Sequence, residues 1–182
     1  MNFLKSFFKF SWDIIKVAIM AFVLAGLVRY FLIQPFFVEG ASMEPNFETG
    51  EYLLIDELSY YFKPIKRSEV VVFHYPLDTS KYYIKRVVGL PEETVEIKNS
   101  QVTIYNNEYP NGFVLNESYL PKNLTTDSQI KKKLGENEYF VLGDNRPVSY
   151  DSRRWGVLPK NDIVGRVWIR AWPFSRAAIF NY

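Results

Sequence analysis

The sequence predicts a mainly β protein, built as a sandwich or barrel-type domain of short antiparallel strands and preceded by one apolar helix. An uncharged apolar run, VAIMAFVLAGLV, occupies residues 17–28 near the start of the chain. After residue 35, short stretches rich in β-branched and aromatic residues alternate with Gly, Pro, Asn and Asp. No regular helical pattern separates these stretches, which favours an all-β domain over a parallel α/β arrangement.

The composition excludes several classes of protein. The chain has 182 residues, enough for one domain together with a short anchor. Hydrophobic residues make up 48%, which supports a folded core and argues against disorder. A net charge of +2 is too small to indicate nucleic acid as a partner. The absence of cysteine and the single histidine, His74, disfavour thiolate zinc sites and multi-histidine centres, so we expect no metal and no cofactor.

The first expected element is a transmembrane helix at residues 12–33. Twenty helical residues span about 30 Å, close to the thickness of a hydrocarbon core. Lys16 and Arg29 lie near the two ends of the run, from which long basic side chains reach the membrane interface. The alternatives are a cleaved signal peptide and a buried helix of a soluble protein.

The charges before this run predict its orientation. Three lysines lie at positions 5, 9 and 16, with Asp13 as the only acid there. By the positive-inside rule, residues 1–11 are expected in the cytoplasm and residues 34–182 on the outer face of the plasma membrane. The sequence therefore predicts a single-pass protein with an extracytoplasmic domain.

Seven strands are expected in that domain. They cover residues 52–56, 69–75, 82–89, 94–98, 101–105, 138–142 and 163–172. The Asn-Ser pair at 99–100 predicts a hairpin with a two-residue turn. Residues 106–137 are polar, rich in Asn and weakly patterned, and we expect them to form a small insertion lobe between two core strands.

Ser42 is a candidate nucleophile, although a turn residue or a helix cap would fit the same local sequence. It lies in VEGASMEP, directly after the apolar part of the chain. A serine hydroxyl attacks only with a base beside it and with donors for the developing oxyanion. His74 is one possible base, but it lies inside a strand-like run with no acid placed around it, which is typical of a structural histidine.

Lys85 is the other possible base, because burial can lower the pKa of a lysine until it is neutral near pH 7. Strand alternation places Lys85 on one face with Tyr83 and Val87, and Arg86 on the other face with Ile84. Alternation alone does not decide which cation points inward. A surface lysine is the ordinary outcome for such a strand.

The segment 143–156, GDNRPVSYDSRRWG, follows a strand and is dense in Asp, Asn, Ser and Arg. An ordinary polar loop is the alternative interpretation. The carboxylates of Asp144 and Asp151 could pair with the guanidinium groups of Arg146 and Arg153 and lock the loop. A locked loop could hold a hydroxyl against a catalytic lysine.

Together these segments resemble the sequence boxes of bacterial type I signal peptidases, the membrane-bound Ser/Lys endopeptidases. The four similar segments, in family order, are 38–45, 66–73, 83–91 and 143–153. The resemblance covers roughly residues 30–175 and leaves only 106–137 unassigned. It implies a catalytic domain of the barrel type shared by signal peptidases and SOS-repressor peptidases. It also implies cleavage of signal peptides with Ala-x-Ala ends from exported preproteins.

The resemblance implies Ser42 as nucleophile, Lys85 as general base and Ser149 as the group that orients the lysine amine. The residues implied to brace the loop are Asp144, Arg146, Asp151 and Arg153. The residues implied to bind substrate are Phe36, Val38, Met43, Tyr83 and Ile84, with Met43 shaping the turn beside the nucleophile. The implied partners are signal peptides and the lipid bilayer, with no nucleic acid, and the enzyme is expected to be a monomer.

The chain departs from the family pattern at three places. Gly40 stands where some members carry a serine whose hydroxyl helps the oxyanion, which leaves main-chain donors alone. Pro147-Val148 and Glu92-Glu93 replace the usual pairs at their positions. Two other functions fit the sequence: maturation of conjugation or pilus proteins by the same Ser/Lys chemistry, and a non-catalytic, membrane-anchored β domain that binds a partner.

Overall fold

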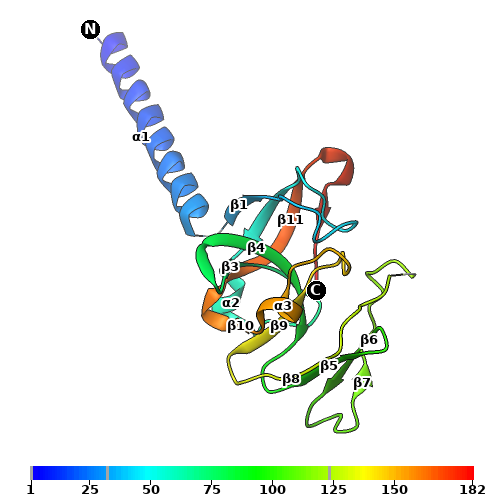
Figure 1. The fold of residues 1–182 in the computed structure, drawn as a ribbon. Helices are drawn as coiled ribbons and strands as arrows, with labels where there is room; N and C mark the ends of the chain where they lie inside the picture. Colours follow the sequence, from blue (N-terminus) through cyan, green and yellow to red (C-terminus); the bar gives the residue numbers. More distant parts are fainter. Residues whose placement is uncertain (1, 32, 123) are drawn as a thin grey trace.

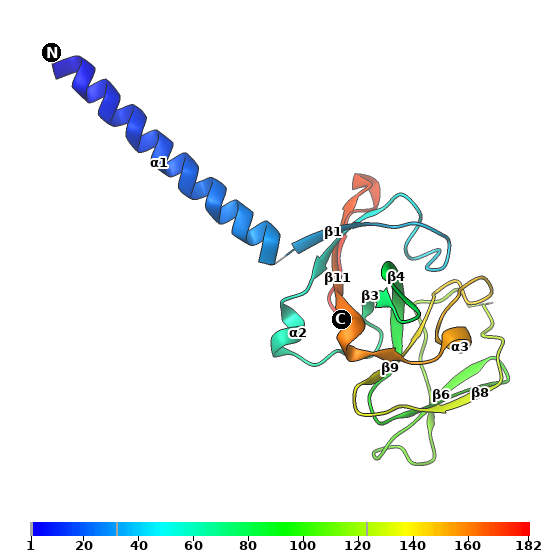
Figure 2. The same ribbon diagram turned by 60° about the vertical axis from the view of Figure 1, so that its left-hand side comes forward.

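The computed structural model (Figure 1) describes residues 2–31, 33–122 and 124–182, with the side chains of residues 7, 10–23, 26, 34–122 and 124–182. A long helix, α1, projects from a β domain that contains two antiparallel sheets. Figure 2 shows the same arrangement from another side, with the smaller sheet on the part of the domain remote from α1. The mainly β class predicted from the sequence is confirmed.

The helix α1 (Asn2–Phe31) begins ten residues before the predicted span, since no proline or glycine interrupts residues 2–11. Among the side chains that the structure describes, no helix is long and apolar enough to cross a membrane. The predicted transmembrane helix at 12–33 is therefore not confirmed. Positions 24, 25 and 27–33 of that range lie outside the described side chains.

The larger sheet carries the site and has the strand order β1-β2-β11-β3-β4-β9-β10, with β12 paired to β11. Its strands are β1 (Ile33–Phe37), β2 (Tyr52–Asp56), β3 (Val70–Tyr75), β4 (Asp78–Gly89), β9 (Glu138–Leu142), β10 (Leu158–Pro159), β11 (Ile163–Trp172) and β12 (Ala178–Ile179). All of their pairings are antiparallel.

The predicted barrel closure is wrong for the strands that the structure describes. Strands β1 and β10 are the two edges of the sheet and do not pair with each other. Each edge contains a proline, Pro35 in β1 and Pro159 in β10, which has no N–H to donate to a further strand. In addition, β10 has only two residues, so it offers few groups for pairing.

The smaller sheet has the order β7-β6-β5-β8. Its strands are β5 (Thr94–Lys98), β6 (Gln101–Tyr105), β7 (Phe113–Val114) and β8 (Ile130–Lys133). The two strands formed by the predicted insertion, β7 and β8, extend the β5–β6 hairpin on its two sides. The segment 106–137 therefore completes a sheet that begins before it.

Short helices and three buried apolar clusters complete the domain. The helices are α2 (Ser59–Phe62), α3 (Ser152–Trp155), η1 (Lys160–Asp162) and η2 (Phe174–Arg176). One cluster contains Val38, Met43, Phe47 and Leu53 and lies directly beneath the segment that carries Ser42. Burial of this apolar surface contributes most of the stability that fixes the segment in place.

All seven predicted strands are present, five of them with the predicted ends. Strand β4 begins four residues early because its start pairs back on β3, with Tyr75 opposite Asp78. The strands that the sequence did not predict, β1, β7, β8, β10 and β12, have two to five residues each. Strands β7, β8, β10 and β12 have at most four residues and carry too few alternating positions to give a period-2 signal, whereas β1 contains Pro35, which argues against a strand.

The hairpin between β5 and β6 supports a first prediction. Asn99 and Ser100 form the predicted two-residue turn with φ values of 51° and 62°. A serine in this left-handed region costs roughly 1 kcal/mol, whereas glycine does not. We expect Ser100→Gly to raise the free energy of unfolding by about 0.5 kcal/mol, since the flexible glycine also stabilises the unfolded chain.

Chemical denaturation of both proteins would measure this gain. Ser100→Ala is the matched control, because alanine also removes the hydroxyl but keeps the Cβ that makes positive φ unfavourable. Equal stabilisation by alanine and glycine would contradict the explanation.

Candidate active site

Ser42 and Lys85 come together from segments that are 43 residues apart. Ser42 lies in a turn after β1, and Lys85 lies in the middle of β4. Lys85 Nζ is hydrogen-bonded to Ser42 Oγ at 2.8 Å. It also donates to the carbonyl oxygen of Ile84 at 2.8 Å. The predicted serine–lysine pair is thus in direct contact, at the distance needed for proton transfer.

The lysine is almost fully removed from solvent, with 4% of its surface exposed. Burial lowers the pKa of Lys85 to about 8, because apolar surroundings penalise the charged ammonium, while Asp151 and Asp144 act weakly in the opposite direction. The ring of Tyr83 covers the amine at 5.3 Å. A lysine with this pKa is neutral in a useful fraction of molecules near pH 7, so it can act as a base.

The structure also answers the question of which cation in β4 points inward. Both do, because both faces of β4 are covered at this point: Lys85 and Arg86 are each buried. Lys85 contacts the serine, and Arg86 contacts Asp144. A lysine is suited to proton transfer, whereas an arginine stays charged in proteins and is suited to an ion pair.

His74 does not take part in this arrangement. Its Nδ1 lies 2.7 Å from the carbonyl oxygen of Thr79. Its ring packs against Tyr82 with 4.4 Å between the ring centroids. It is a structural residue near the β3–β4 hairpin end, as its sequence context indicated.

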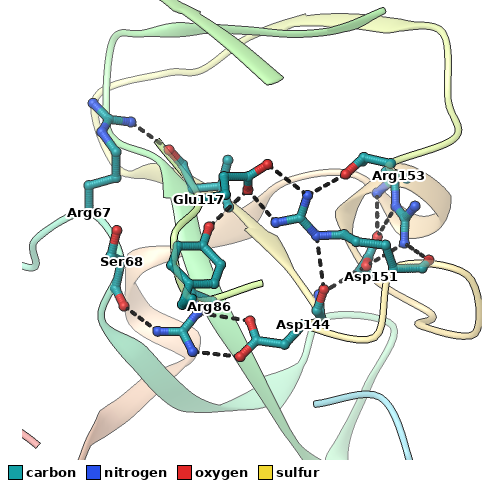
Figure 3. Close-up of polar contacts among 12 residues, drawn as sticks. Arg67, Ser68, Arg86, Glu117, Asp144, Asp151 and Arg153 are labelled. Atoms are coloured by element: carbon teal, nitrogen blue, oxygen red, sulfur yellow. Dashed lines mark hydrogen bonds and ion pairs between the residues drawn. The ribbon is translucent and has the colours of Figure 1, made fainter. Parts of the chain in front are cut away.

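Asp144 is buried and pairs with Arg86, not with an arginine of its own loop (Figure 3). Arg86 Nε donates to Asp144 at 2.8 Å, and its other amino group donates to the carbonyl oxygen of Ser68 at 2.8 Å. Asn46 donates to the same carboxylate at 2.8 Å and to the carbonyl oxygen of Tyr119 at 2.9 Å. The loop is therefore tied to β4 and to the nucleophile segment.

Arg146 is fully buried and pairs with Glu117, which belongs to the segment 106–137. It also donates to the hydroxyl of Thr126 and to the carbonyl oxygen of Gly143. Within the loop, the remaining pair is Arg153 with Asp151, at 2.8 Å and 2.9 Å. The predicted self-contained lock is thus corrected: one pair is internal, and two pairs join the loop to other parts of the chain.

Sequence reasoning missed the roles of Asn46, Arg86, Glu117 and Thr126. Arg86 and Glu117 are 58 and 29 positions from their ion-pair partners. No local pattern marks such pairs, because the charges meet only after the sheets have formed. The one available signal was the presence of Arg86 in a strand next to a candidate base.

Ser149 packs against Gly143, where a Cβ would lie 2.1 Å from Ser149 Oγ and 2.4 Å from the carbonyl oxygen of Ser42. Only glycine therefore allows this close approach of the loop to the nucleophile segment. Ser149 Oγ is buried and has no hydrogen-bond partner among the described residues. The role expected for it, orienting the lysine amine, stays a prediction.

Ser42 and Lys85 open onto a groove of ≈ 650 Å³. Four of the predicted substrate-binding residues line it: Phe36, Val38, Tyr83 and Ile84. The fifth, Met43, does not, because its side chain is fully buried in the core beneath the turn. Further lining residues that the sequence did not indicate include Leu53, Val72, Tyr82, Val148 and Tyr150. The groove is mainly apolar and suits an extended peptide with small side chains.

Comparison with known proteins places these features in a family. The model of the family described as "Signal peptidase, peptidase S26" matches residues 11–172. A signal peptidase I of Leptolyngbya laminosa is 36% identical over 171 residues, which cover 89% of this chain and 80% of that relative. A signal peptidase IB of Staphylococcus aureus (strain Mu50) is 34% identical over 173 residues, 89% of each chain.

A crystal structure of a signal peptidase I from Enterococcus faecalis V583 also matches, with a TM-score of 0.48 and 30% identity over 58% of this chain and 97% of that one. The family match and the two relatives cover most of the chain, and the range of the family match includes every residue of the serine–lysine site. On these grounds the chain belongs to the bacterial type I signal peptidases of peptidase family S26, which are serine peptidase hydrolases.

Proposed function

We propose that this protein cleaves N-terminal signal peptides from exported preproteins, with Ser42 as nucleophile and Lys85 as general base. The observation that carries the proposal is the 2.8 Å contact between a buried lysine amine and a serine hydroxyl at the floor of a peptide-sized groove. A lysine on the surface would remain protonated at neutral pH and would not serve as a base.

The reaction has two stages in this proposal. Ser42 Oγ attacks the carbonyl carbon of the scissile peptide bond while its proton passes to Lys85 Nζ. The lysine then gives that proton to the departing amine, which leaves an acyl-enzyme ester on Ser42. A water molecule, deprotonated by Lys85, attacks the ester and releases the signal peptide. No step requires a metal or an organic cofactor.

The groove accounts for specificity in this proposal. Phe36, Val38 and Ile84 form apolar walls close to the nucleophile. Small side chains such as those of Ala-x-Ala ends fit shallow apolar pockets, whereas larger ones are excluded by shape. The extended conformation of a peptide in the groove would also let main-chain groups pair with strand edges.

We further propose that α1 anchors the enzyme in the membrane, with the domain after residue 33 on the outer face. The proposal rests on apolar side chains of α1 that face solvent in the structure, among them Trp12, Met20 and Phe22. An anchored enzyme and a membrane-embedded signal peptide share one surface, which raises their effective concentration. Protease treatment of inside-out vesicles tests the orientation: digestion of the domain in such vesicles would contradict it.

The decisive experiment is cleavage of a preprotein that carries Ala-x-Ala before its mature end. Ser42→Ala and Lys85→Ala should each abolish turnover, while His74→Ala should retain it. Normal turnover by Ser42→Ala would overturn the proposed function. Loss of activity in His74→Ala, together with normal activity in Lys85→Ala, would overturn the assignment of the base.

The pH dependence of the wild-type enzyme follows from the pKa of Lys85. Because only the neutral amine accepts a proton, kcat/KM should rise about tenfold per pH unit below the pKa and level off above it. The midpoint is expected at about 8, where burial places the lysine. Initial rates measured between about pH 6 and pH 10 would show this. A midpoint near 6.5 would point to a histidine instead.

A further inference from the structure

Asn145 makes two hydrogen bonds to the backbone that carries the nucleophile. Its own N–H donates to the carbonyl oxygen of Ser42 at 3.0 Å. Its side-chain amide nitrogen donates to the carbonyl oxygen of Ala41 at 3.0 Å. The acceptor of the side-chain bond, Ala41 O, is a carbonyl oxygen, so the side chain must present its NH₂ end to it. The residue therefore holds the peptide groups on both sides of Ser42.

The bond to Ala41 also determines where the Ser42 N–H points. The Ala41–Ser42 peptide bond is trans, since the cis bonds of the described chain lie elsewhere. In a trans peptide group the C=O and N–H point in opposite directions within one plane. Anchoring the Ala41 oxygen on Asn145 thus turns the Ser42 N–H away from the loop. Within the described chain this N–H has no acceptor.

A free N–H at the nucleophile is a donor for the oxyanion that forms during attack. The Ser42 N–H matters more in this chain than in relatives with a serine at this position, because Gly40 has no hydroxyl that could donate a second hydrogen bond to the oxyanion. Gly40 also has a φ of +90°, which a side chain at this position would strain. The orientation of one peptide plane therefore matters for the rate.

Asn145 is rigidly placed for this task. The residue before it, Asp144, is held by the buried pair with Arg86 (Figure 3), and the residue after it, Arg146, is held by Glu117. Among the described residues, the only other hydrogen bond to the Ala41 oxygen is the longer turn bond from the Glu44 N–H, at 3.3 Å. Of the two hydrogen bonds that hold the Ala41–Ser42 peptide plane, the one from the Asn145 side chain is thus the shorter.

We propose that Asn145 is a positioning residue that orients the Ser42 N–H as the oxyanion donor, by holding the Ala41 carbonyl through its side-chain amide. This inference rests on the proposed function, because it assumes attack by Ser42. Asn145 itself does not touch the substrate. It acts through the peptide plane between Ala41 and Ser42, and its effect is confined to the charged tetrahedral stage of the reaction.

The test compares Asn145→Ala and Asn145→Asp with the wild type in the full-length chain. Removing an oxyanion donor outright costs about 10²–10³ in kcat, so a donor that is only misoriented should lower kcat by about 10–100-fold. The KM should stay within about twofold, because the ground-state substrate carries no oxyanion. The aspartate has the same shape but presents an oxygen to a carbonyl oxygen, so it should be no better than alanine.

A second readout separates positioning from a general structural effect. A peptide aldehyde ending in Ala-x-Ala forms a hemiacetal with Ser42, and its affinity should fall by the same factor as kcat. The matched peptide alcohol forms no oxyanion, and its affinity should not change. The pH midpoint should also be unchanged, because Lys85 is untouched. Asn161→Ala, an exposed asparagine in η1, is the control for loss of an amide and should match the wild type.

Each outcome decides the question. Equal losses in affinity for the aldehyde and the alcohol, or wild-type kcat in both variants, would overturn the role of Asn145. If Asn145→Ala melts at a lower temperature than the wild type, the kcat of the isosteric Asn145→Asp decides the question, because this variant keeps the hydrogen bond from the backbone N–H of residue 145. The proposed function itself is decided by preprotein cleavage with the Ser42→Ala and Lys85→Ala variants, a result independent of the Asn145 variants.

Discussion

Replacing Lys85 with methionine is expected to lower kcat by about 10⁴-fold or more, as removal of a member of a nucleophile–base unit does in serine peptidases. Methionine is similar in length and apolar, so it should fill the space beneath Tyr83 without a cavity. The variant should also melt at the same or a higher temperature near pH 7. Burial lowers the pKa of this lysine, which means that the folded state disfavours its charged form.

The sign of that stability effect can be checked by pH. Below about pH 8 the folded and unfolded states both carry the charged amine, so the penalty of burying it is fully present. The penalty disappears as the pH rises through 8 toward the unfolded value of 10.5. The stability advantage of Lys85→Met should therefore shrink in the same range. Thermal melts of both proteins across this range would measure it.

Lys81→Ala is the matched control for the lysine. Lys81 belongs to the same strand, β4, as Lys85 but is exposed and paired with Asp78 at 2.8 Å. Because it has solvent and a surface partner, its loss should change kcat little. If Lys81→Ala lost as much kcat as Lys85→Met, the general positive charge of β4, and not the buried base, would explain the effect.

Replacing Asp144 with asparagine is expected to reduce the free energy of unfolding by about 3–5 kcal/mol, because it leaves a buried guanidinium without its counter-ion. Asp144 is fully buried and Arg86 nearly so, so the guanidinium left behind is shielded from bulk solvent. The change should also shift the rising limb of the pH–rate profile to lower pH. Asp144 raises the pKa of Lys85, so its removal lets burial lower that pKa further.

Urea denaturation and the pH–rate profile measure these two effects. Asp127→Asn, a change to an exposed carboxylate, should leave both unchanged. The double variant Arg86→Met with Asp144→Leu should be more stable than Asp144→Asn alone, since it buries no unpaired charge. A double variant that is less stable than the single one would show that the pair contributes more than it costs to bury.

Much of the candidate active site could be predicted from the sequence, because its residues lie in short local patterns. The strand that carries Lys85 is marked by β-branched and aromatic residues, and Ser42 and the segment 143–156 match family boxes. Strand positions were also predictable, since period-2 alternation between turn residues is a local property. The turn at Asn99–Ser100 was recognised for the same reason, although its residues are not the best for that geometry.

The tertiary structure alone decided how these parts are joined. Arg86 meets Asp144, and Arg146 meets Glu117, because β4, the loop and the segment 106–137 converge only after the two sheets have formed. Alternation could not tell which cation of β4 is buried, and both are. The open edges of the sheet follow from prolines and short strands that pair with partners distant in sequence.

The sequence by itself located most strands, because these depend on residue type and on alternation over a few positions, and it pointed to Ser42 and Lys85 as nucleophile and base only through the resemblance of their segments to a known family. The fold determined that Lys85 is removed from water and that Met43 lies in the core. It also determined that the Asn145 side chain is hydrogen-bonded to the carbonyl oxygen of Ala41, next to Ser42. Each of these depends on contacts between segments far apart in the chain. Desolvation and ion pairing are properties of the packed interior, and no local pattern carries them.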